Sequence, residues 1–406
     1  MSEDPLIEDP LISEMHVDEV TYPGKAVGRI DGLVTFVPGA LKGEQVRVKE
    51  VHRHKRHRAA SLIEVLEPSP NRVTPSCPLA ASCPGCRYQH TTYAHELEMK
   101  SEQFASMLKR MAGLEAPNVN AVVSSPREQG YRNKIVLHST LVDDILKVGY
   151  VGEDNKSIIV LDEGCPLAVD PINETLLKLQ ADGMLRLREN EPLTLRYTES
   201  DGVVHWRGEG DVKVPWLTEK WRFGDLWVPR RSFFQINRDV GNVLVDRVVD
   251  LMTAIAPEMV VDLYCGVGVF ALAAAEMGVQ HVLGIDNNAE AIKAAQHNAQ
   301  VMAQNDTTFI DVSARKATRE ALGPMDRETG LLIVDPPRSG LHTEVCAEIC
   351  ELGPGHLIYI SCGPDTLCRD LKALTAAGYA LDSTQIFDMF PRTPHFEVLT
   401  HLVRTD

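Results

Sequence analysis

The chain has 406 residues, of which 44% are hydrophobic and 24% are charged. This balance is typical of folded protein and excludes a disordered, collagen-like or coiled-coil chain. The apolar runs fall short of the roughly eighteen residues that a spanning helix needs, so we expect no membrane segment. The formal charge of −16 argues against indiscriminate coating of nucleic acid but leaves room for a local basic surface.

Residues 1–15 are expected to form an acidic tail. The first fourteen residues carry five acids and no basic side chain, unlike a secretory signal or a mitochondrial transit peptide. We therefore expect a cytoplasmic protein. In that reducing compartment, the nine cysteines predict ligands, nucleophiles or core residues rather than a disulfide framework.

Residues 16–66 show short β-like runs separated by Pro-Gly and Asp-Gly pairs. About fifty residues of this kind suit a small five-stranded barrel of the oligonucleotide-binding type. Between Lys42 and Arg58 there are seven basic residues and two acids, with three His among them. This block predicts contact with phosphates, and a solvated charged hairpin is the alternative.

Residues 67–232 are expected to form a β-rich middle domain, with a helix at 93–111 and short antiparallel strands from about residue 118. We expect that helix to pack on the C-terminal domain. From residue 233 to residue 406 the pattern changes to alternating strands and helices. This alternation predicts an α/β fold with a doubly wound parallel sheet. Its expected strands are 260–263, 281–285, 331–334 and 357–361.

A cofactor site is predicted where the strand at 260–263 runs into a glycine-rich turn. Gly266 and Gly268 let the backbone approach a ligand, and the helix that follows offers free N–H groups. Asp286 ends the next strand, where a carboxylate can accept hydrogen bonds from both hydroxyls of a ribose. NAD and S-adenosylmethionine folds share these features, so they do not choose between the two cofactors.

The choice between the cofactors rests on Asp335, Pro336, Pro337 and Arg338, at the end of a later strand. Strand ends on this side of an open α/β sheet line the ligand crevice. An acid followed by two prolines forms a stiff loop, of the kind that methyltransferases acting on planar substrates often have beside the methyl donor. The loop favours S-adenosylmethionine, and a simple strand stop is the alternative.

Two residues are candidates for the chemistry. Cys362 follows the strand at 357–361, where a thiolate can act as a nucleophile, and core packing is the alternative. Glu397 lies in an apolar run, where burying a carboxylate is costly without a task, and an exposed strand position is the alternative. Thiolate attack on carbon 6 of uracil activates carbon 5 for methylation, after which a base must remove the carbon-5 proton. We assign Cys362 as the nucleophile and Glu397 as the base.

The sequence resembles the RNA 5-methyluridine methyltransferase family. The matching stretches are 233–237, 262–270, 335–338, 361–364 and 388–397. The first fifty or so residues past the tail resemble the TRAM domain, an RNA-binding barrel.

The resemblance implies particular roles for the predicted site residues. Gln235 and Tyr264 would contact S-adenosylmethionine, Asp286 would hold its ribose, and Asp335 would lie near its adenine or the target base. The roles given to Cys362 and Glu397 agree with the family pattern.

Three positions depart from the family pattern. Gly363 stands where Asn is usual, Asp286 where Glu is common and Val269 where Asn is frequent. The first change removes a side-chain amide that could hold the uracil or the loop. The second shortens the reach of the carboxylate but keeps its charge, and the third removes a candidate cofactor contact.

Four cysteines have the spacing of a metal site. Cys77, Cys83 and Cys86 follow the pattern C-x5-C-x2-C, and Cys165 lies 79 residues further on. Four thiolates could bind zinc or an iron–sulfur cluster, and spacing alone favours zinc. The resemblance implies a 4Fe-4S cluster instead, with a structural or RNA-docking role.

The sequence thus predicts an enzyme that converts a uridine in structured RNA to 5-methyluridine. One alternative is methylation of an exocyclic amine at the Asp335 loop, which would not need Cys362. Another is a non-catalytic RNA-binding module. The resemblance favours 23S rRNA as the substrate, with the T-loop uridine of tRNA as the alternative, and we expect no obligate protein partner.

Overall fold

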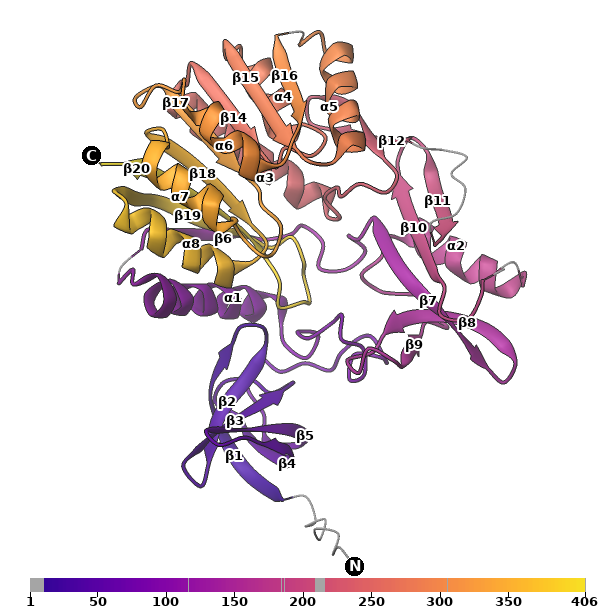
Figure 1. Ribbon diagram of the computed structural model, residues 1–406. Coiled ribbons are helices and arrows are strands. Elements are labelled where there is room, and N and C mark those ends of the chain that lie inside the picture. Colours follow the sequence, from indigo (N-terminus) through magenta and orange to yellow (C-terminus); the bar gives the residue numbers. More distant parts are fainter. Residues whose placement is uncertain are drawn as a thin grey trace, which may run out of the picture. The chain divides into compact units, whose positions relative to one another are not determined.

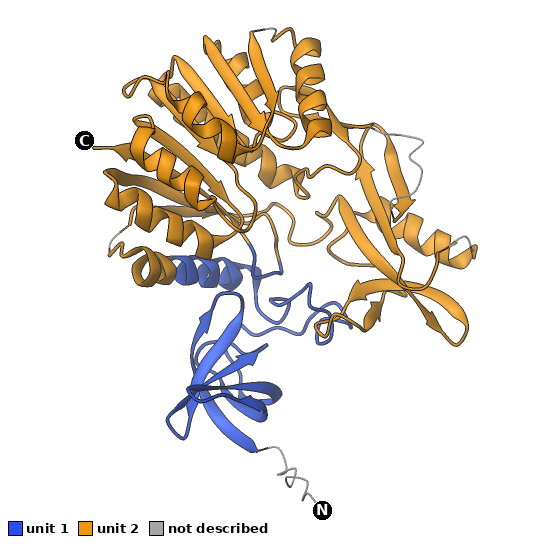
Figure 2. Ribbon diagram, viewed as in Figure 1, with its two compact units in different colours: residues 1–104, 392–395 blue, residues 105–391, 396–406 orange. Residues whose placement is uncertain are grey.

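The computed structural model describes residues 11–115, 117–183, 185, 187–208, 216–304 and 306–405. The chain divides into two compact units, which Figure 2 distinguishes by colour. Unit 1 comprises residues 1–104 and 392–395, and unit 2 comprises residues 105–391 and 396–406. The three-part arrangement with boundaries near residues 66 and 232 stays a prediction. In the described ranges, no helix is long and apolar enough to cross a membrane.

Unit 1 begins with a closed barrel of five strands in the order β1-β2-β3-β5-β4 (Figure 1). These strands are β1 (Ile12–Thr21), β2 (Lys25–Ile30), β3 (Leu33–Pro38), β4 (Gln45–Arg53) and β5 (His57–Glu67). The predicted barrel is confirmed.

The expected acidic tail was too long at its C-terminal end. Met15 pairs with Val46 of β4 and is 1% exposed, as a member of the barrel core. Alternate residues of a strand face the same side, so the acids of this stretch can point outward while Met15 and Val17 fill the core. The first ten residues of the expected tail lie outside the described residues.

The helix expected at 93–111 is present as α1 (Tyr93–Met107), continued by a π-helical turn, η1 (Leu108–Ala112). The turn ends at Gly113, whose φ of 77° is the left-handed conformation that closes many helices. Within unit 2, η1 contacts α8 (Pro364–Ala376), a helix of the C-terminal α/β region.

Unit 2 contains an antiparallel sheet of five strands in the order β11-β10-β7-β8-β9 and a separate hairpin. Helix α2 (Asp170–Ala181) contacts β10 and β11. The strands of the sheet are β7 (Lys134–Val142), β8 (Ile145–Val151), β9 (Ile158–Val160), β10 (Pro192–Thr198) and β11 (Gly202–Arg207), and those of the hairpin are β12 (Trp216–Trp221) and β13 (Gly224–Pro229).

A second sheet of unit 2 has eight strands in the order β16-β15-β14-β17-β18-β20-β19-β6 (Figure 1). The five strands from β16 to β18 run parallel, which confirms the doubly wound α/β fold. The eight strands are β6 (Val119–Val123), β14 (Met259–Leu263), β15 (His281–Asp286), β16 (Thr307–Asp311), β17 (Gly330–Val334), β18 (His356–Ser361), β19 (Tyr379–Phe387) and β20 (Glu397–Arg404). The helices between them are α3 (Arg238–Ile255), α4 (Val269–Glu276), α5 (Ala289–Val301), α6 (Ala314–Leu322), α7 (Thr343–Leu352) and α8.

The C-terminal side of this sheet is mixed rather than purely parallel. β20 runs antiparallel to both β18 and β19, and β6 pairs parallel with β19. β6 comes from a segment more than two hundred residues before its partner, so local sequence patterning could not assign it to this sheet.

The carboxyl ends of four parallel strands carry residues that we predicted for the site. β14 ends at Leu263, just before Tyr264, and β15 ends at Asp286. Asp335 follows β17, and Cys362 follows β18. Because these four strands are neighbours in the sheet, their ends form one edge, which is where ligands bind in open α/β sheets.

Candidate active site

A cavity of about 880 Å³ lies within unit 2 at the carboxyl ends of the parallel strands. All seven residues predicted for catalysis or cofactor binding line it: Gln235, Tyr264, Gly266, Asp286, Asp335, Cys362 and Glu397. Phe233 and Arg338 line it as well. The structure thus brings the predicted residues together, while the role of each stays a prediction.

The turn after β14 is fixed by the carboxylate of Asp286. Its Oδ2 accepts a hydrogen bond from the backbone N–H of Gly266 at 3.0 Å, and its Oδ1 accepts one from the backbone N–H of Asn288 at 2.8 Å. Gly268 has a φ of +88°, and a Cβ there would lie 2.8 Å from the ring of Phe309. Glycine is therefore required at that position for both conformation and space.

Tyr264 holds an unusual backbone conformation in the same turn. Its φ of 69° is in the left-handed region, which is uncommon for a bulky residue and often marks functional sites. Burial, with the nearby Asp370 and Asp286 carboxylates, raises the pKa of its hydroxyl to about 12. The side chain therefore stays a neutral hydroxyl at physiological pH.

The segment that carries Gln235 is held by two asparagines. Asn237 accepts a hydrogen bond from the backbone N–H of Val240 and so caps α3, and Asn133 donates its side-chain N–H to the carbonyl of Gln235 at 3.1 Å. The side-chain oxygen Oε1 of Gln235 is buried and has no hydrogen-bond partner among the described residues. A buried acceptor without a partner is costly, so this oxygen is suited to a donor on a ligand.

Phe233 is a site residue to which sequence reasoning gave no role. Its side chain lines the cavity and is 70% exposed, whereas the adjacent Phe234 is 7% exposed and belongs to the core. An exposed ring at the mouth of a cavity is suited to stacking on an unstacked base. The sequence did contain a signal, the Phe-Phe pair. Neighbouring side chains of an extended segment point to opposite sides, so only one of the two rings can face the core.

The loop that begins at Asp335 is anchored by Asp370 of α8. Asp370 Oδ2 accepts hydrogen bonds from the backbone N–H of Leu341 at 2.9 Å and from the hydroxyl of Tyr359 at 2.8 Å. Arg369 donates to the carbonyl of Leu341 at 3.0 Å. These contacts hold the loop at Leu341, and at its start the backbone N–H of Asp335 donates to the carbonyl of Leu263 at 3.3 Å, so Asp335 and Arg338 are presented by a fixed backbone.

Asp335 is a carboxyl group with a strongly perturbed acidity. Burial, and to a lesser degree the charge of Asp286, raises its pKa to about 7. A carboxyl group that is half protonated near neutral pH can donate or accept a hydrogen bond, and such perturbed groups gather at functional sites.

Cys362 and Glu397 share the part of the cavity around Arg338. Burial, together with the charges of Glu397 and Asp335, raises the pKa of the Cys362 thiol to about 12. Arg338 opposes this shift through its positive charge and, to a lesser degree, through hydrogen bonding. Burial and Asp335 also raise the pKa of Glu397, again opposed by the charge of Arg338.

Glu397 is buried rather than exposed at the start of β20. Its side chain is 4% exposed, and Oε2 has no hydrogen-bond partner within the described part of the chain. The alternative of an ordinary exposed strand position is therefore wrong. Arg338, which sequence reasoning included in a motif without a role, is the cation that both groups face.

The four cysteines of the expected metal site are divided between the units. Cys77, Cys83 and Cys86 belong to unit 1, and Cys165 belongs to unit 2. All are free of disulfides. Among the described residues, no group of three or more His, Cys, Asp or Glu side chains is arranged to hold a metal ion.

Comparison with known proteins agrees with this geometry. The family model described as tRNA (Uracil-5-)-methyltransferase matches residues 226–405. The chain is 28% identical to the 23S rRNA (uracil(1939)-C(5))-methyltransferase RlmD of Marinomonas sp. (strain MWYL1), with 96% of this chain and 94% of that protein covered. It is 29% identical to an uncharacterized RNA methyltransferase of Gloeobacter violaceus, with 94% of each chain covered.

A solved structure resembles the chain over nearly its whole length. The tRNA (uracil-54, C5)-methyltransferase of Pyrococcus abyssi, solved in complex with S-adenosyl-L-homocysteine, is 28% identical, with a TM-score of 0.75 and coverage of 96% of this chain and 99% of that chain. The similarity therefore includes the barrel and the antiparallel sheet as well as the α/β region. Residues 226–405 match that family model, and the chain is similar to RNA (uracil-5-)-methyltransferases over nearly its whole length.

Proposed function

We propose that this enzyme uses S-adenosylmethionine to methylate carbon 5 of a uridine in structured RNA. The observation that carries the proposal is the meeting of Cys362, Glu397 and Asp335 in the cavity that also holds the glycine-rich turn and Asp286. Methylation of an exocyclic amine would need no nucleophilic thiol at this place, so Cys362 favours the carbon-5 reaction.

The residues at the sheet edge fit the cofactor. The backbone at Gly266 leaves room for a ligand, since no atom beyond its two chain neighbours lies within 4 Å of where its Cβ would be. Asp286 stands at the end of β15, where ribose hydroxyls can donate to it, and the unpartnered Oε1 of Gln235 suits an amino group. When bound there, S-adenosylmethionine supplies an electrophilic methyl group.

Catalysis begins at Cys362. Its sulfur forms a bond to carbon 6 of the uracil, and the electron pair of the carbon 5–carbon 6 double bond moves towards carbon 5 and the carbon-4 carbonyl. Because the thiol has a pKa of about 12, it is protonated at neutral pH, and its proton must pass to solvent before the sulfur attacks. Arg338 stabilises the thiolate through charge and hydrogen bonding, which lowers the cost of that step.

Glu397 completes the reaction after carbon 5 has taken the methyl group. The carboxylate removes the carbon-5 proton, the double bond forms again, and the bond between carbon 6 and the sulfur of Cys362 breaks. A buried carboxyl group with a raised pKa is a stronger base than an exposed one, which suits it to remove a carbon-bound proton.

Transfer of a labelled methyl group tests this function. RNA incubated with the protein and labelled S-adenosylmethionine should yield 5-methyluridine after digestion to nucleosides. Label in N6-methyladenosine or another amine-methylated nucleoside, with none in 5-methyluridine, would contradict the proposal.

The substrate is proposed to be 23S rRNA. The relative from Marinomonas bears the name of a 23S rRNA enzyme, and the solved relative from Pyrococcus abyssi bears that of a tRNA enzyme. The test is a comparison of 23S rRNA and tRNA transcripts, both free of modified nucleosides, under the same conditions. Faster methylation of tRNA would favour the alternative.

The barrel is proposed to bind RNA through the hairpin of β4 and β5. Arg53, Lys55 and Arg56 are exposed at its tip, beside the rings of His52 and His54, which lie 4.3 Å apart. Other members of the basic block are neutralised: Arg58 is buried and pairs with acids, and Arg47 pairs with two glutamates. Replacing the three tip cations by Ala should weaken RNA binding and leave binding of S-adenosylhomocysteine unchanged.

The 4Fe-4S cluster on Cys77, Cys83, Cys86 and Cys165 stays a proposal that rests on the family resemblance. The described residues do not form a metal-holding group as they stand. We give the cluster no step in the reaction, and we propose the cytoplasm as the location of the protein. Iron and acid-labile sulfide in anaerobically purified protein would support the cluster, and a colourless protein with zinc or no metal would contradict it.

A further inference from the structure

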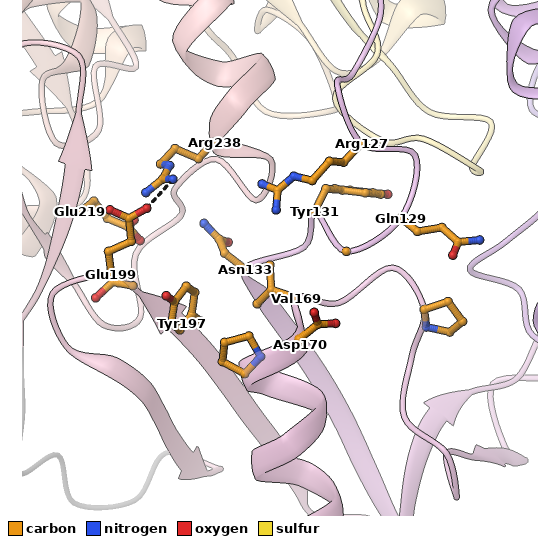
Figure 3. A pocket seen from close by; sticks show the side chains of 14 residues that line it. Arg127, Gln129, Tyr131, Asn133, Val169, Asp170, Tyr197, Glu199, Glu219 and Arg238 are labelled. Atoms are coloured by element: carbon orange, nitrogen blue, oxygen red, sulfur yellow. Dashed lines mark ion pairs between the residues drawn. The ribbon is translucent and has the colours of Figure 1, made fainter.

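Unit 2 has a second cavity, of about 530 Å³, which the proposed reaction does not use. It lies against the antiparallel sheet and the start of α3, and Figure 3 shows the side chains around it. Those with polar groups include Asn133, Asp170, Tyr197, Glu199, Glu219 and Arg238. Its size is that of pockets that take nucleosides and other small ligands.

The two cavities share a wall. Gln235 lines the cofactor cavity, and its backbone carbonyl accepts the hydrogen bond from Asn133, which lines the second cavity. Arg238, three residues after Gln235, also lines the second cavity. The second cavity therefore lies next to the cavity in which we propose that the target nucleotide binds.

The cations of the second cavity are already engaged. Arg238 pairs with Glu199 at 2.6 Å, the dashed contact in Figure 3, and Arg127 pairs with Asp239 at 2.7 Å. Asp170 and Glu219 add two further carboxylates to the lining. Because the cations are paired and the lining carries additional carboxylates, a phosphate or another anion is disfavoured as the occupant.

Glu219 offers a hydrogen-bond acceptor at the wall of this cavity. Its side chain is 4% exposed, and both hydrogen bonds from Arg196 go to Oε1, at 3.2 and 2.7 Å. Neither of these bonds uses the other oxygen, Oε2. A carboxylate oxygen in so confined a place favours a ligand that donates hydrogen bonds.

We propose that the second cavity binds an amino-bearing nucleobase of the RNA strand that carries the target uridine. Guanine fits best, because its N1–H and its N2 amino group are neighbouring donors that suit the carboxylates of Glu219 and Asp170 in the lining. The ring of Tyr197, which is half-buried beside them, provides a surface on which a base can stack. Uracil carries a single donor and fits poorly. The proposal rests on the proposed function for the identity of the ligand as RNA.

Guanosine and uridine are the probes for the test, with the full-length protein saturated by S-adenosylhomocysteine so that the cofactor site is filled. Dissociation constants come from ligand-observed NMR titration. The variants are E219Q and D170N, which remove acceptor charges, and E174Q on the same helix as Asp170, an exposed acid that does not line the cavity. A melting curve is measured for each, since Arg196 loses its charged partner in E219Q.

The proposal predicts that E219Q and D170N each weaken guanosine binding about tenfold, while E174Q does not and uridine binding is unchanged in all three. It is overturned if guanosine does not bind, or if D170N and a folded E219Q both bind it as the parent protein does. If E219Q does not fold, the guanosine affinities of D170N and E174Q are compared, and equal affinities overturn the proposal.

Methyl transfer by the parent protein is measured in parallel. Methylation of RNA without guanosine binding overturns this inference alone, and guanosine binding without methylation of any RNA overturns the proposed function alone.

Discussion

Gly363 and Arg338 lie so close that a Cβ on residue 363 would be 2.7 Å from the backbone carbonyl oxygen of Arg338. The hydroxyl of Thr366 donates hydrogen bonds to that carbonyl and to the carbonyl of Gly363, both at 2.9 Å. The loop that carries Cys362 therefore packs directly against the loop that carries Arg338. An Asn at position 363 would not fit this arrangement unless the two loops moved apart.

Replacing Gly363 by Asn should separate these loops and move Arg338 away from Cys362. We expect methyl transfer to fall about tenfold or more and the free energy of unfolding to fall by about 1–3 kcal/mol. Enzyme kinetics and thermal unfolding measure the two effects. Gly323→Ala is the matched control, because its φ is −53° and its Cβ would meet no atom closer than 3.4 Å. Full activity in the Asn variant would show that the loops need not touch.

The rate of 5-methyluridine formation should rise with pH between about 6 and 9, because the Cys362 thiol must lose its proton to attack and Glu397 must be ionised to remove the carbon-5 proton, and both groups have raised pKa values. Arg338 lowers both pKa values, so Arg338→Met should shift the profile to higher pH and reduce the rate at neutral pH. Arg338→Lys, which keeps the charge, should restore part of the loss. The pH–rate profiles of the three proteins test this. A shift of the Met variant to lower pH would contradict the electrostatic role.

Asp335 should destabilise the protein above neutral pH. Its pKa is about 7 in the folded chain and near 3.8 in an ordinary setting, so the folded state holds a proton that the unfolded state releases. Stability therefore falls as pH rises through this interval. Asp335→Asn should be more stable than the parent at pH 8, on the order of 1–2 kcal/mol, and should gain less at pH 5.

Thermal unfolding at the two pH values measures the effect of Asp335→Asn. Asp311→Asn, an exposed change on β16, is the control and should alter stability little at either pH. A larger gain at pH 5 than at pH 8 would contradict the assigned sign.

Glu397→Gln should stop the reaction after methyl transfer. Without a base for the carbon-5 proton, the bond between Cys362 and carbon 6 cannot break, and protein should accumulate covalently on ordinary uridine RNA. Denaturing electrophoresis with methyl-labelled cofactor detects the adduct. Normal turnover in this variant would mean that another group removes the proton.

The sequence predicted the edge of the parallel sheet well because each site residue there stands next to a short buried strand. Tyr264, Asp286, Asp335 and Cys362 could be placed together from strand ends alone, since parallel neighbours end on the same side. The role of Arg338 could not be foreseen, because it depends on a contact between two loops rather than on a local pattern.

Other features depended on contacts distant in sequence. Ile12–Thr21 contains acids that resemble a tail, yet its alternate residues fill the barrel. β6 joins β19 from a segment far upstream. The second cavity gathers side chains from the antiparallel sheet, α2 and α3, none of which carries a motif by itself.

Covalent trapping on RNA that contains 5-fluorouridine tests the central claim most directly. Fluorine cannot leave carbon 5 as a proton does, so the reaction should halt with Cys362 bonded to carbon 6 after methyl transfer. The account predicts a denaturation-resistant adduct that requires S-adenosylmethionine, disappears in Cys362→Ala and persists in Cys350→Ala, whose thiol does not line the cavity. An adduct that survives in Cys362→Ala, or no adduct from a protein that methylates the unsubstituted RNA, would contradict it.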